Sequence, residues 1–93
     1  MFRVIFSRHA IGQMFDRGIS IDDIETTISN GEVIEAYTDD KPYPSRLILH
    51  KLGDRPIHVV VADNLQDQEV IVVTAYEPSL AIWELEFRKR KLK

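Results

Sequence analysis

The sequence predicts one α+β domain, in which two N-terminal helices pack on a twisted antiparallel sheet of about four strands, completed by a short C-terminal helix or arm. Hydrophobic residues recur at helical spacing over residues 7–30, and the pattern then alternates over residues 31–76 with short polar turns. The 93 residues contain no repeat and no linker, and a chain of this length suits one hydrophobic core. We therefore treat residues 1–93 as a single domain, with residues 88–93 as a basic, flexible tail.

The first helix is expected to begin after Ser7 and to end at Gly18. A serine hydroxyl can accept a hydrogen bond from a first-turn N–H, and glycine can adopt the left-handed conformation that ends a helix. Residues four apart lie on one side of a helix. We expect two adjacent apolar ridges to pack against the core: Ala10 with Met14, and Ile11 with Phe15.

The second helix is predicted from Ser20 to Asn30, with Gly31 after it. Asp23 stands three residues after Ser20, where a carboxylate completes a capping box. Isoleucines at spacings of three and four form its buried stripe: Ile21, Ile24 and Ile28.

Four strands are expected to follow: residues 32–37, 45–52, 55–63 and 69–76. Their short connections favour antiparallel neighbours, because parallel neighbours need long crossovers. Residues 2–6 alternate loosely and are predicted to form a short edge strand or an extended lead-in.

The third and fourth of these strands are apolar on both sides, which indicates that both faces of the sheet are covered. In the third strand Ile57, Val59 and Val61 point one way, opposite to His58. The helices can cover one face. The other face requires a ligand, another chain or residues 79–87, which carry Trp83 and are too apolar to be left in water.

The charge is unevenly distributed along the chain. Residues 88–93 hold five of the twelve basic residues, so the other 87 residues carry seven basic and fifteen acidic ones, a net charge of −8. A basic tail can contact phosphates, whereas an acidic body disfavours broad nucleic-acid binding. The absence of cysteine excludes disulfides, and no apolar run is long enough for a membrane span, so we expect a soluble, cytoplasmic protein.

Polar residues on the first helix are the strongest candidates for chemistry. His9, Gln13 and Arg17 follow one another at four-residue steps and therefore share one face. Imidazole suits acid–base work because its ordinary pKa lies near neutrality. The three histidines, His9, His50 and His58, show no metal-ligand spacing, and no glycine-rich phosphate loop is present, so we expect neither a metal nor a nucleotide cofactor.

Two strands add further candidates. Arg46 could bind a phosphate through two parallel hydrogen bonds and shares a strand face with His50. Thr74 and Tyr76 share a face near the end of the last strand. Ordinary structural roles are open for all of them: Arg46 can pair with an acid, His58 can be a hydrogen-bonded interior residue, and strand threonine and tyrosine are favoured by packing.

The order of motifs SRHA, RGIS, GEVIE, PYPSRLIL, RPIHVVVA and VIVVTAY resembles a bacterial family of small uncharacterised domains grouped with the RelE-like and BrnT-like toxins of the barnase, EndoU, colicin and RelE nuclease superfamily. The resemblance spans residues 6–88 and implies two helices on a twisted antiparallel sheet. It also implies metal-independent RNA cleavage, in which a base frees the 2′-hydroxyl to attack phosphorus.

By position, His9, Arg17, Thr74 and Tyr76 match polar positions of that family, whereas Gln13 stands where relatives often carry another arginine. The expected roles are His9 as general acid or base, Arg17 and Arg46 on phosphate, and Thr74 or Tyr76 as a hydrogen-bonding group. Arg46 is added from its chemistry alone. RNA contacts are also expected from the basic tail: Arg88, Lys89 and Arg90.

A non-catalytic protein is the alternative. Its sheet or C-terminal arm would engage an antitoxin-like protein or a second copy of the chain, and the acidic body favours such an interaction module over a tight RNA binder.

Overall fold

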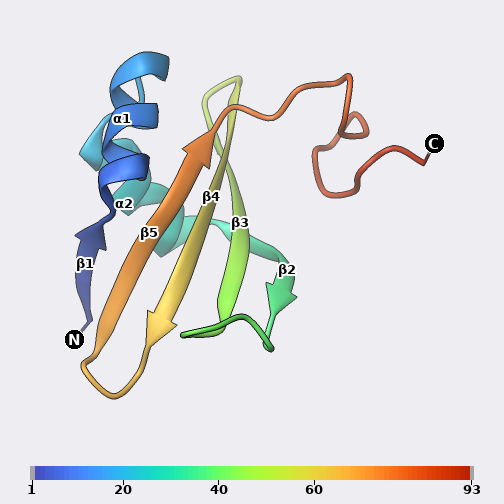
Figure 1. Ribbon diagram of the computed structural model, residues 1–93. Coiled ribbons are helices and arrows are strands. Elements are labelled where there is room, and N and C mark those ends of the chain that lie inside the picture. Colours follow the sequence, from blue (N-terminus) through green and yellow to red (C-terminus); the bar gives the residue numbers. More distant parts are fainter. Residues whose placement is uncertain (1, 93) are drawn as a thin grey trace.

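The computed structural model describes residues 2–92 and shows an α+β fold with two helices on one face of a five-stranded sheet (Figure 1). The strand order across the sheet is β1-β5-β4-β3-β2. Neither helix is long and apolar enough to cross a membrane. The elements in chain order are β1 (Arg3–Phe6), α1 (Arg8–Arg17), α2 (Ile21–Asn30), β2 (Glu32–Tyr37), β3 (Ser45–Leu52), β4 (Arg55–Asn64) and β5 (Glu69–Tyr76).

The sheet is mixed, which differs from the antiparallel sheet of about four strands that the sequence predicts. Strands β2 to β5 form the expected antiparallel meander, but β1 pairs with β5 in parallel, with Val4 opposite Val70. Short connections constrain only strands that are neighbours in sequence. Because the whole intervening chain joins β1 to β5, it supplies the crossover that a parallel pair needs.

Both helices begin and end where the sequence predicts. The Ser7 hydroxyl accepts a hydrogen bond from the Ala10 N–H, and Ser20 and Asp23 form a complete capping box. Gly18 ends α1 with a left-handed φ of 65°. Gly31 follows α2 closely against β3, where an added Cβ would lie 2.5 Å from Ile48 Cγ2. Glycine at this position lets α2 approach the sheet.

The core lies between the helices and one face of the sheet. Its members come from every layer: Ala10, Met14, Ile19, Ile24, Ile48, Ile57, Val59, Val61, Val70, Val72 and Ala75. The inward direction of Ile57, Val59 and Val61 agrees with the sequence. Ala75 joins this face because a register shift between β4 and β5 interrupts the alternation expected for β5.

The prediction that Ile11 and Phe15 pack against the core is wrong. Ile11 is 55% exposed and Phe15 is 87% exposed, whereas Ala10 and Met14 are buried. Helix α1 is turned so that the row of Gln13 and Arg17 faces β5. Ile11 and Phe15, which lie on the other side of Ala10 and Met14, are therefore turned away from the sheet.

That orientation of α1 satisfies the backbone of β5 beyond the end of β1. The Ser7 N–H donates to the Val72 carbonyl at 3.1 Å. Further along α1, the Ala75 N–H donates to Gln13 Oε1 at 3.2 Å, and Arg17 Nη1 donates to the Ala75 carbonyl at 3.3 Å. Buried backbone groups need such partners. The polar face of α1 thus takes the place of a missing neighbouring strand.

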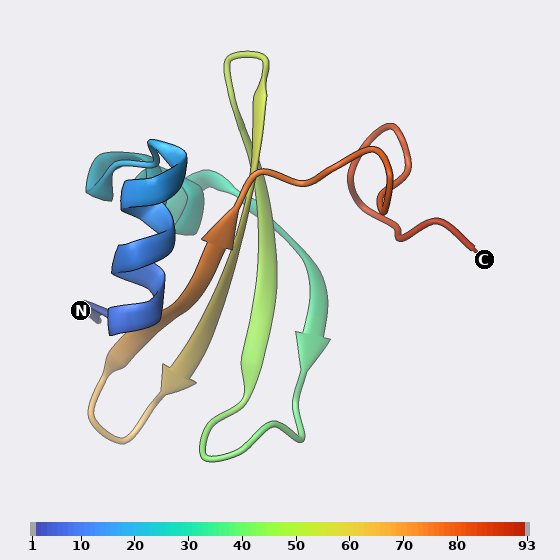
Figure 2. The same cartoon turned by 45° about the horizontal axis from the view of Figure 1, so that its top comes forward.

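The C-terminal segment, residues 78–92, lies on the other side of the sheet from the helices (Figure 2). Of the two alternatives that the sequence allowed, a short helix or an arm, it forms the arm, which is closed on itself by a bridge between Trp83 and Arg90. Trp83 is only 2% exposed and docks on the sheet as the sequence predicts. Of the predicted tail, Lys93 lies outside the described residues.

Replacing Gln13 by alanine is expected to lower the free energy of unfolding by about 1–3 kcal/mol, because the buried Ala75 N–H loses its acceptor. His9 belongs to the same row and is exposed, so His9→Ala is the matched control and should change stability by less than about 0.5 kcal/mol. Urea denaturation measures both. Equal effects of the two substitutions would contradict the proposed role of Gln13.

Candidate active site under the C-terminal segment

The structure does not bring the five predicted catalytic side chains together. His9 is exposed on α1. Arg17 is bound to the Ala75 carbonyl, and the Thr74 hydroxyl donates to Gln13 Oε1. Both contacts lie between α1 and β5, where a structural role explains Arg17 and Thr74. A catalytic role for this group stays a prediction.

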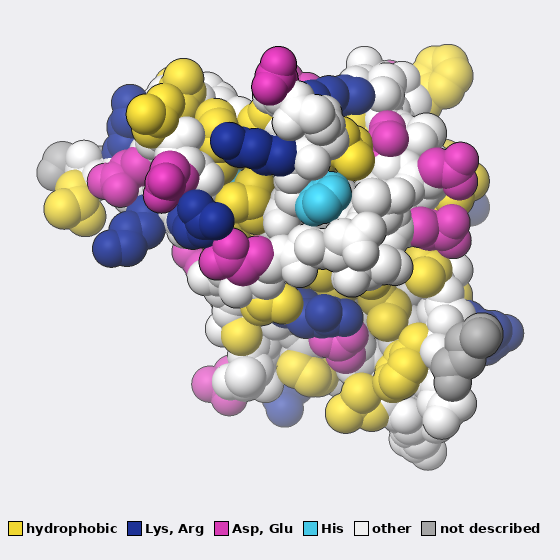
Figure 3. Space-filling view, turned by 180° about the vertical axis from the view of Figure 1, so that it is seen from behind, with side chains coloured by type: hydrophobic (Ala, Val, Ile, Leu, Met, Phe, Trp, Pro, Cys, Tyr) yellow, Lys and Arg dark blue, Asp and Glu magenta, His cyan; other side chains and the backbone are white. Residues whose placement is uncertain are grey.

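Arg46 lies on a different face of the sheet from Tyr76. It sits opposite Val61 on the core side, where its guanidinium holds Asp63 through two hydrogen bonds of 2.9 and 3.1 Å. Tyr76 instead sits opposite His58. Figure 3 shows the molecule from behind, where basic side chains are interspersed with acidic ones rather than forming a continuous basic patch. Because Asp63 holds its guanidinium, Arg46 is not positioned to bind a free phosphate.

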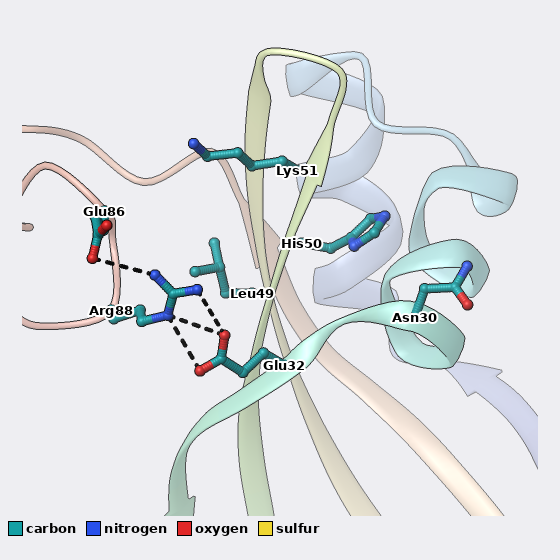
Figure 4. A pocket seen from close by; sticks show the side chains of 7 residues that line it. All are labelled: Asn30, Glu32, Leu49, His50, Lys51, Glu86 and Arg88. Carbon is teal, nitrogen blue, oxygen red and sulfur yellow. Dashed lines mark hydrogen bonds and ion pairs between the residues drawn. The ribbon is translucent and has the colours of Figure 1, made fainter.

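A pocket of about 460 Å³ lies between β2, β3 and the C-terminal segment. Figure 4 shows Arg88 in this pocket held by Glu32 and Glu86, while His50 projects toward α2. The hydrogen bond from Arg88 lowers the pKa of Glu32 and keeps it ionised. Arg88 is thus paired with carboxylates and is not free to contact RNA.

A second cluster of polar side chains lies under the C-terminal segment, centred on His58. The imidazole is fully buried on β4. Its Nδ1 lies 3.1 Å from the Tyr76 hydroxyl, and its Nε2 lies 2.9 Å from the Phe87 carbonyl oxygen. The Trp83 ring packs edge-on against it, with ring centroids 4.4 Å apart. Two strands and the C-terminal segment therefore meet at one imidazole.

The hydrogen bonds of His58 determine which nitrogen carries the proton. A carbonyl oxygen can only accept, so Nε2 must donate to Phe87. In neutral imidazole the other nitrogen is then an acceptor, and the Tyr76 hydroxyl donates to Nδ1. Burial lowers the pKa of His58 below its usual 6.5, and the positive charge of Arg90 also lowers it. The imidazole is therefore neutral at pH 7.

Charged and phenolic groups surround this imidazole. Burial raises the pKa of Tyr76 above its usual 10.0, so its hydroxyl keeps its proton. The Tyr37 hydroxyl donates to Glu35 on β2, and burial together with that hydrogen bond raises the pKa of Tyr37. The Arg90 guanidinium lies 5.1 Å from the centre of the Trp83 ring. The Arg90 guanidinium lowers, and the Glu35 carboxylate raises, the pKa of both His58 and Tyr76.

This arrangement has the components of acid–base chemistry at a phosphate. A neutral imidazole can take a proton, a phenol can return one, and a guanidinium can stabilise developing negative charge. Within residues 2–92 no three histidine, aspartate or glutamate side chains are grouped to hold a metal ion.

Sequence reasoning included Tyr76, Arg90 and His58 among its candidates but did not connect them. It missed Glu35 and Tyr37, whose spacing of two residues on a predicted strand was the available signal, because it places both on one face. Which side chains of the neighbouring strands lie next to Glu35 and Tyr37 depends on the strand register, which the sequence does not give. The meeting of His58 with Tyr76 follows from the shifted β4–β5 pairing, which single-strand patterns do not reveal.

Comparison with protein families identifies a family to which the chain is similar. A family described as "Domain of unknown function (DUF4258)" matches residues 6–77, which is most of the chain. The chain belongs to the DUF4258 family. The expectation of a small uncharacterised domain family is thereby confirmed, whereas the resemblance to the RelE-like and BrnT-like toxins stays a prediction. No curated protein and no solved structure matches the chain.

The part of this DUF4258 chain that matches contains both helices and strands β2 to β5. His58 and Tyr76 therefore lie inside the matched region. The C-terminal segment, with Trp83, Phe87 and Arg90, lies outside it.

The buried neutral imidazole predicts a pH-dependent stability. The pKa of His58 is lower in the folded state than in the unfolded chain, so the unfolded chain binds more protons between the two values. The contribution of His58 to stability is therefore fully present above pH 6.5 and is lost as the pH falls from 6.5 through the folded pKa. Chemical denaturation at pH 5–8 should show a smaller loss on acidification in His58→Gln than in wild type. Parallel curves would contradict a buried neutral His58.

Proposed function

We propose that this chain is a metal-independent ribonuclease in which His58 and Tyr76 perform the acid–base chemistry. The hydrogen bond between the neutral His58 imidazole and the protonated Tyr76 hydroxyl carries the proposal. Arg90 and Glu35 act electrostatically on the same two groups, so the cluster combines the parts that RNA cleavage needs on one side of the sheet.

The reaction begins when the Phe87 carbonyl leaves His58. Once Nε2–H is exposed to water, it loses its proton to solvent and Nδ1 takes one up, so that Nδ1–H donates to the Tyr76 oxygen. The lone pair of Nε2 is then free to accept the proton of an RNA 2′-hydroxyl. The 2′-oxygen bonds to phosphorus while the bond from phosphorus to the 5′-oxygen breaks. Tyr76 protonates the leaving oxygen and recovers a proton from the imidazolium. The products are a 2′,3′-cyclic phosphate and a free 5′-hydroxyl.

The C-terminal segment contributes both a cation and a stacking surface. Arg90 can stabilise the negative charge on phosphorus in the transition state, and Trp83 offers an aromatic face for a base once the segment moves. In the structure this segment covers His58 and its Phe87 carbonyl occupies Nε2, while Tyr76 of β5 occupies Nδ1. RNA must therefore displace the Phe87 carbonyl before cleavage.

Cleavage of a labelled single-stranded RNA by the full chain, with and without EDTA, tests the proposal. The wild type should cleave in both conditions, and Tyr76→Phe, which removes only the hydroxyl, should lower the rate about a hundredfold or more. Arg90→Ala should also lower it, and because this side chain is exposed and lies over the Trp83 ring, the change in the free energy of unfolding should stay below about 1 kcal/mol. His58→Gln should abolish cleavage and requires a parallel measurement of folding, since the imidazole is buried.

His9→Ala distinguishes this site from the one predicted on α1, and His50→Gln is a matched control outside both. Full activity in His9→Ala with loss in Tyr76→Phe supports the His58 site. Loss in His9→Ala with full activity in Tyr76→Phe would place the chemistry on α1 instead. Cleavage that disappears in EDTA would contradict metal independence.

An interaction module remains the second candidate, and the closed state of His58 favours it. Both ring nitrogens have partners and Trp83 covers the ring, as expected of a structural interior histidine. Absence of cleavage by the folded wild type, together with binding of a protein partner, would support this candidate.

A further inference from the structure

Two rows of side chains on α1 are exposed in the fold. Residues four apart lie on one side of a helix, so Ile11 and Phe15 form one row and Arg8, Gly12 and Asp16 form the adjacent row. Phe15 is 87% exposed, and all five residues are exposed. Helix α1 therefore presents an apolar strip bordered by a line of opposite charges, which we call the outer face of α1.

Gly12 lies in the middle of α1 for no reason that the fold itself supplies. A Cβ added there would have no atom within 4 Å, and its φ is not left-handed. Glycine within a helix lowers stability relative to alanine. Because Gly12 has no side chain, however, another backbone can approach α1 closely at the centre of the outer face.

The charges of the outer face oppose the helix dipole. Arg8 is the first residue of α1, where negative charge is favoured, and Asp16 is the last but one, where positive charge is favoured. Within residues 2–92 neither side chain makes a hydrogen bond or ion pair. Each charge would be stabilised by an opposite charge from outside the chain.

We propose that the outer face of α1 binds the same face of a second copy, with the two helices antiparallel and crossing at Gly12. Arg8 and Asp16 are each four residues from Gly12, so a two-fold axis at this glycine brings Arg8 of each copy opposite Asp16 of the other. By the same axis Phe15, three residues from Gly12, comes opposite His9 of the other copy. Phe15 is thereby covered and both unfavourable charges gain partners.

The symmetry of the outer face selects a second copy over an unrelated partner. A two-fold interface requires a surface that is complementary to itself, and charges of opposite sign at equal distances from a small central residue satisfy this requirement. One helix of ten residues is about 15 Å long, so the interface is small and the dimer should depend on concentration.

The dimer is independent of the proposed ribonuclease activity. The helices and the C-terminal segment lie on opposite sides of the sheet, so the His58 cluster is not covered by the second copy (Figure 2).

Sedimentation equilibrium of the full chain over a range of concentrations tests the proposal. The wild type should associate to a dimer. Arg8→Asp and Asp16→Arg should each weaken association at least about tenfold, because each substitution puts like charges together. The double variant Arg8→Asp with Asp16→Arg should restore the dimer, since it exchanges the two charges and recovers both pairs.

Loss of folding does not explain these outcomes, because both single substitutions bring α1 into agreement with its dipole and should maintain or raise the unfolding midpoint. Gly12→Ala provides a second check: it should raise the unfolding midpoint but weaken dimerisation. A wild type that is monomeric at all concentrations, or a dimer that all these variants leave unchanged, would overturn the proposal. A double variant that stays monomeric would also overturn it.

Discussion

The contact of the C-terminal segment with His58 is the constraint on which one whole side of this molecule depends. Strand β4 is central and apolar on both faces, so each face needs a cover. The helices cover the face of Ile57 and Val59. On the opposite face Trp83 packs on His58, and the Phe87 carbonyl satisfies its Nε2–H. A polar side chain can be buried there only because both ring nitrogens have partners.

The need of buried polar groups for hydrogen-bond partners also explains the orientation of α1. Its polar row satisfies the backbone of β5, which leaves its second apolar row and its end charges facing outward. The molecule thus has two distinct surfaces: a covered acid–base cluster on one side of the sheet and a self-complementary helix face on the other. Membership of the DUF4258 family establishes neither function, and each proposal rests on its own geometry.

Local signals in the sequence predicted the local structure. Ser7 and Ser20 cap helices as expected, because a capping hydroxyl needs only its own first turn. The burial of β4 was also predicted, since an alternating strand has only two faces. Contacts set by tertiary orientation were not predictable: the exposure of Phe15 follows from how α1 is turned, and the pairing of His58 with Tyr76 follows from a register shift. These properties depend on where another element lies.

Proton-detected nitrogen NMR of the histidine side chains at pH 7 tests the central claim most directly. It reports which ring nitrogen of His58 carries the proton in the folded chain. The structure predicts one fixed tautomer, protonated at Nε2 and unprotonated at Nδ1, that exchanges slowly with water. A ring protonated at Nδ1, or one that exchanges rapidly between tautomers, would contradict the burial of His58 beneath the C-terminal segment.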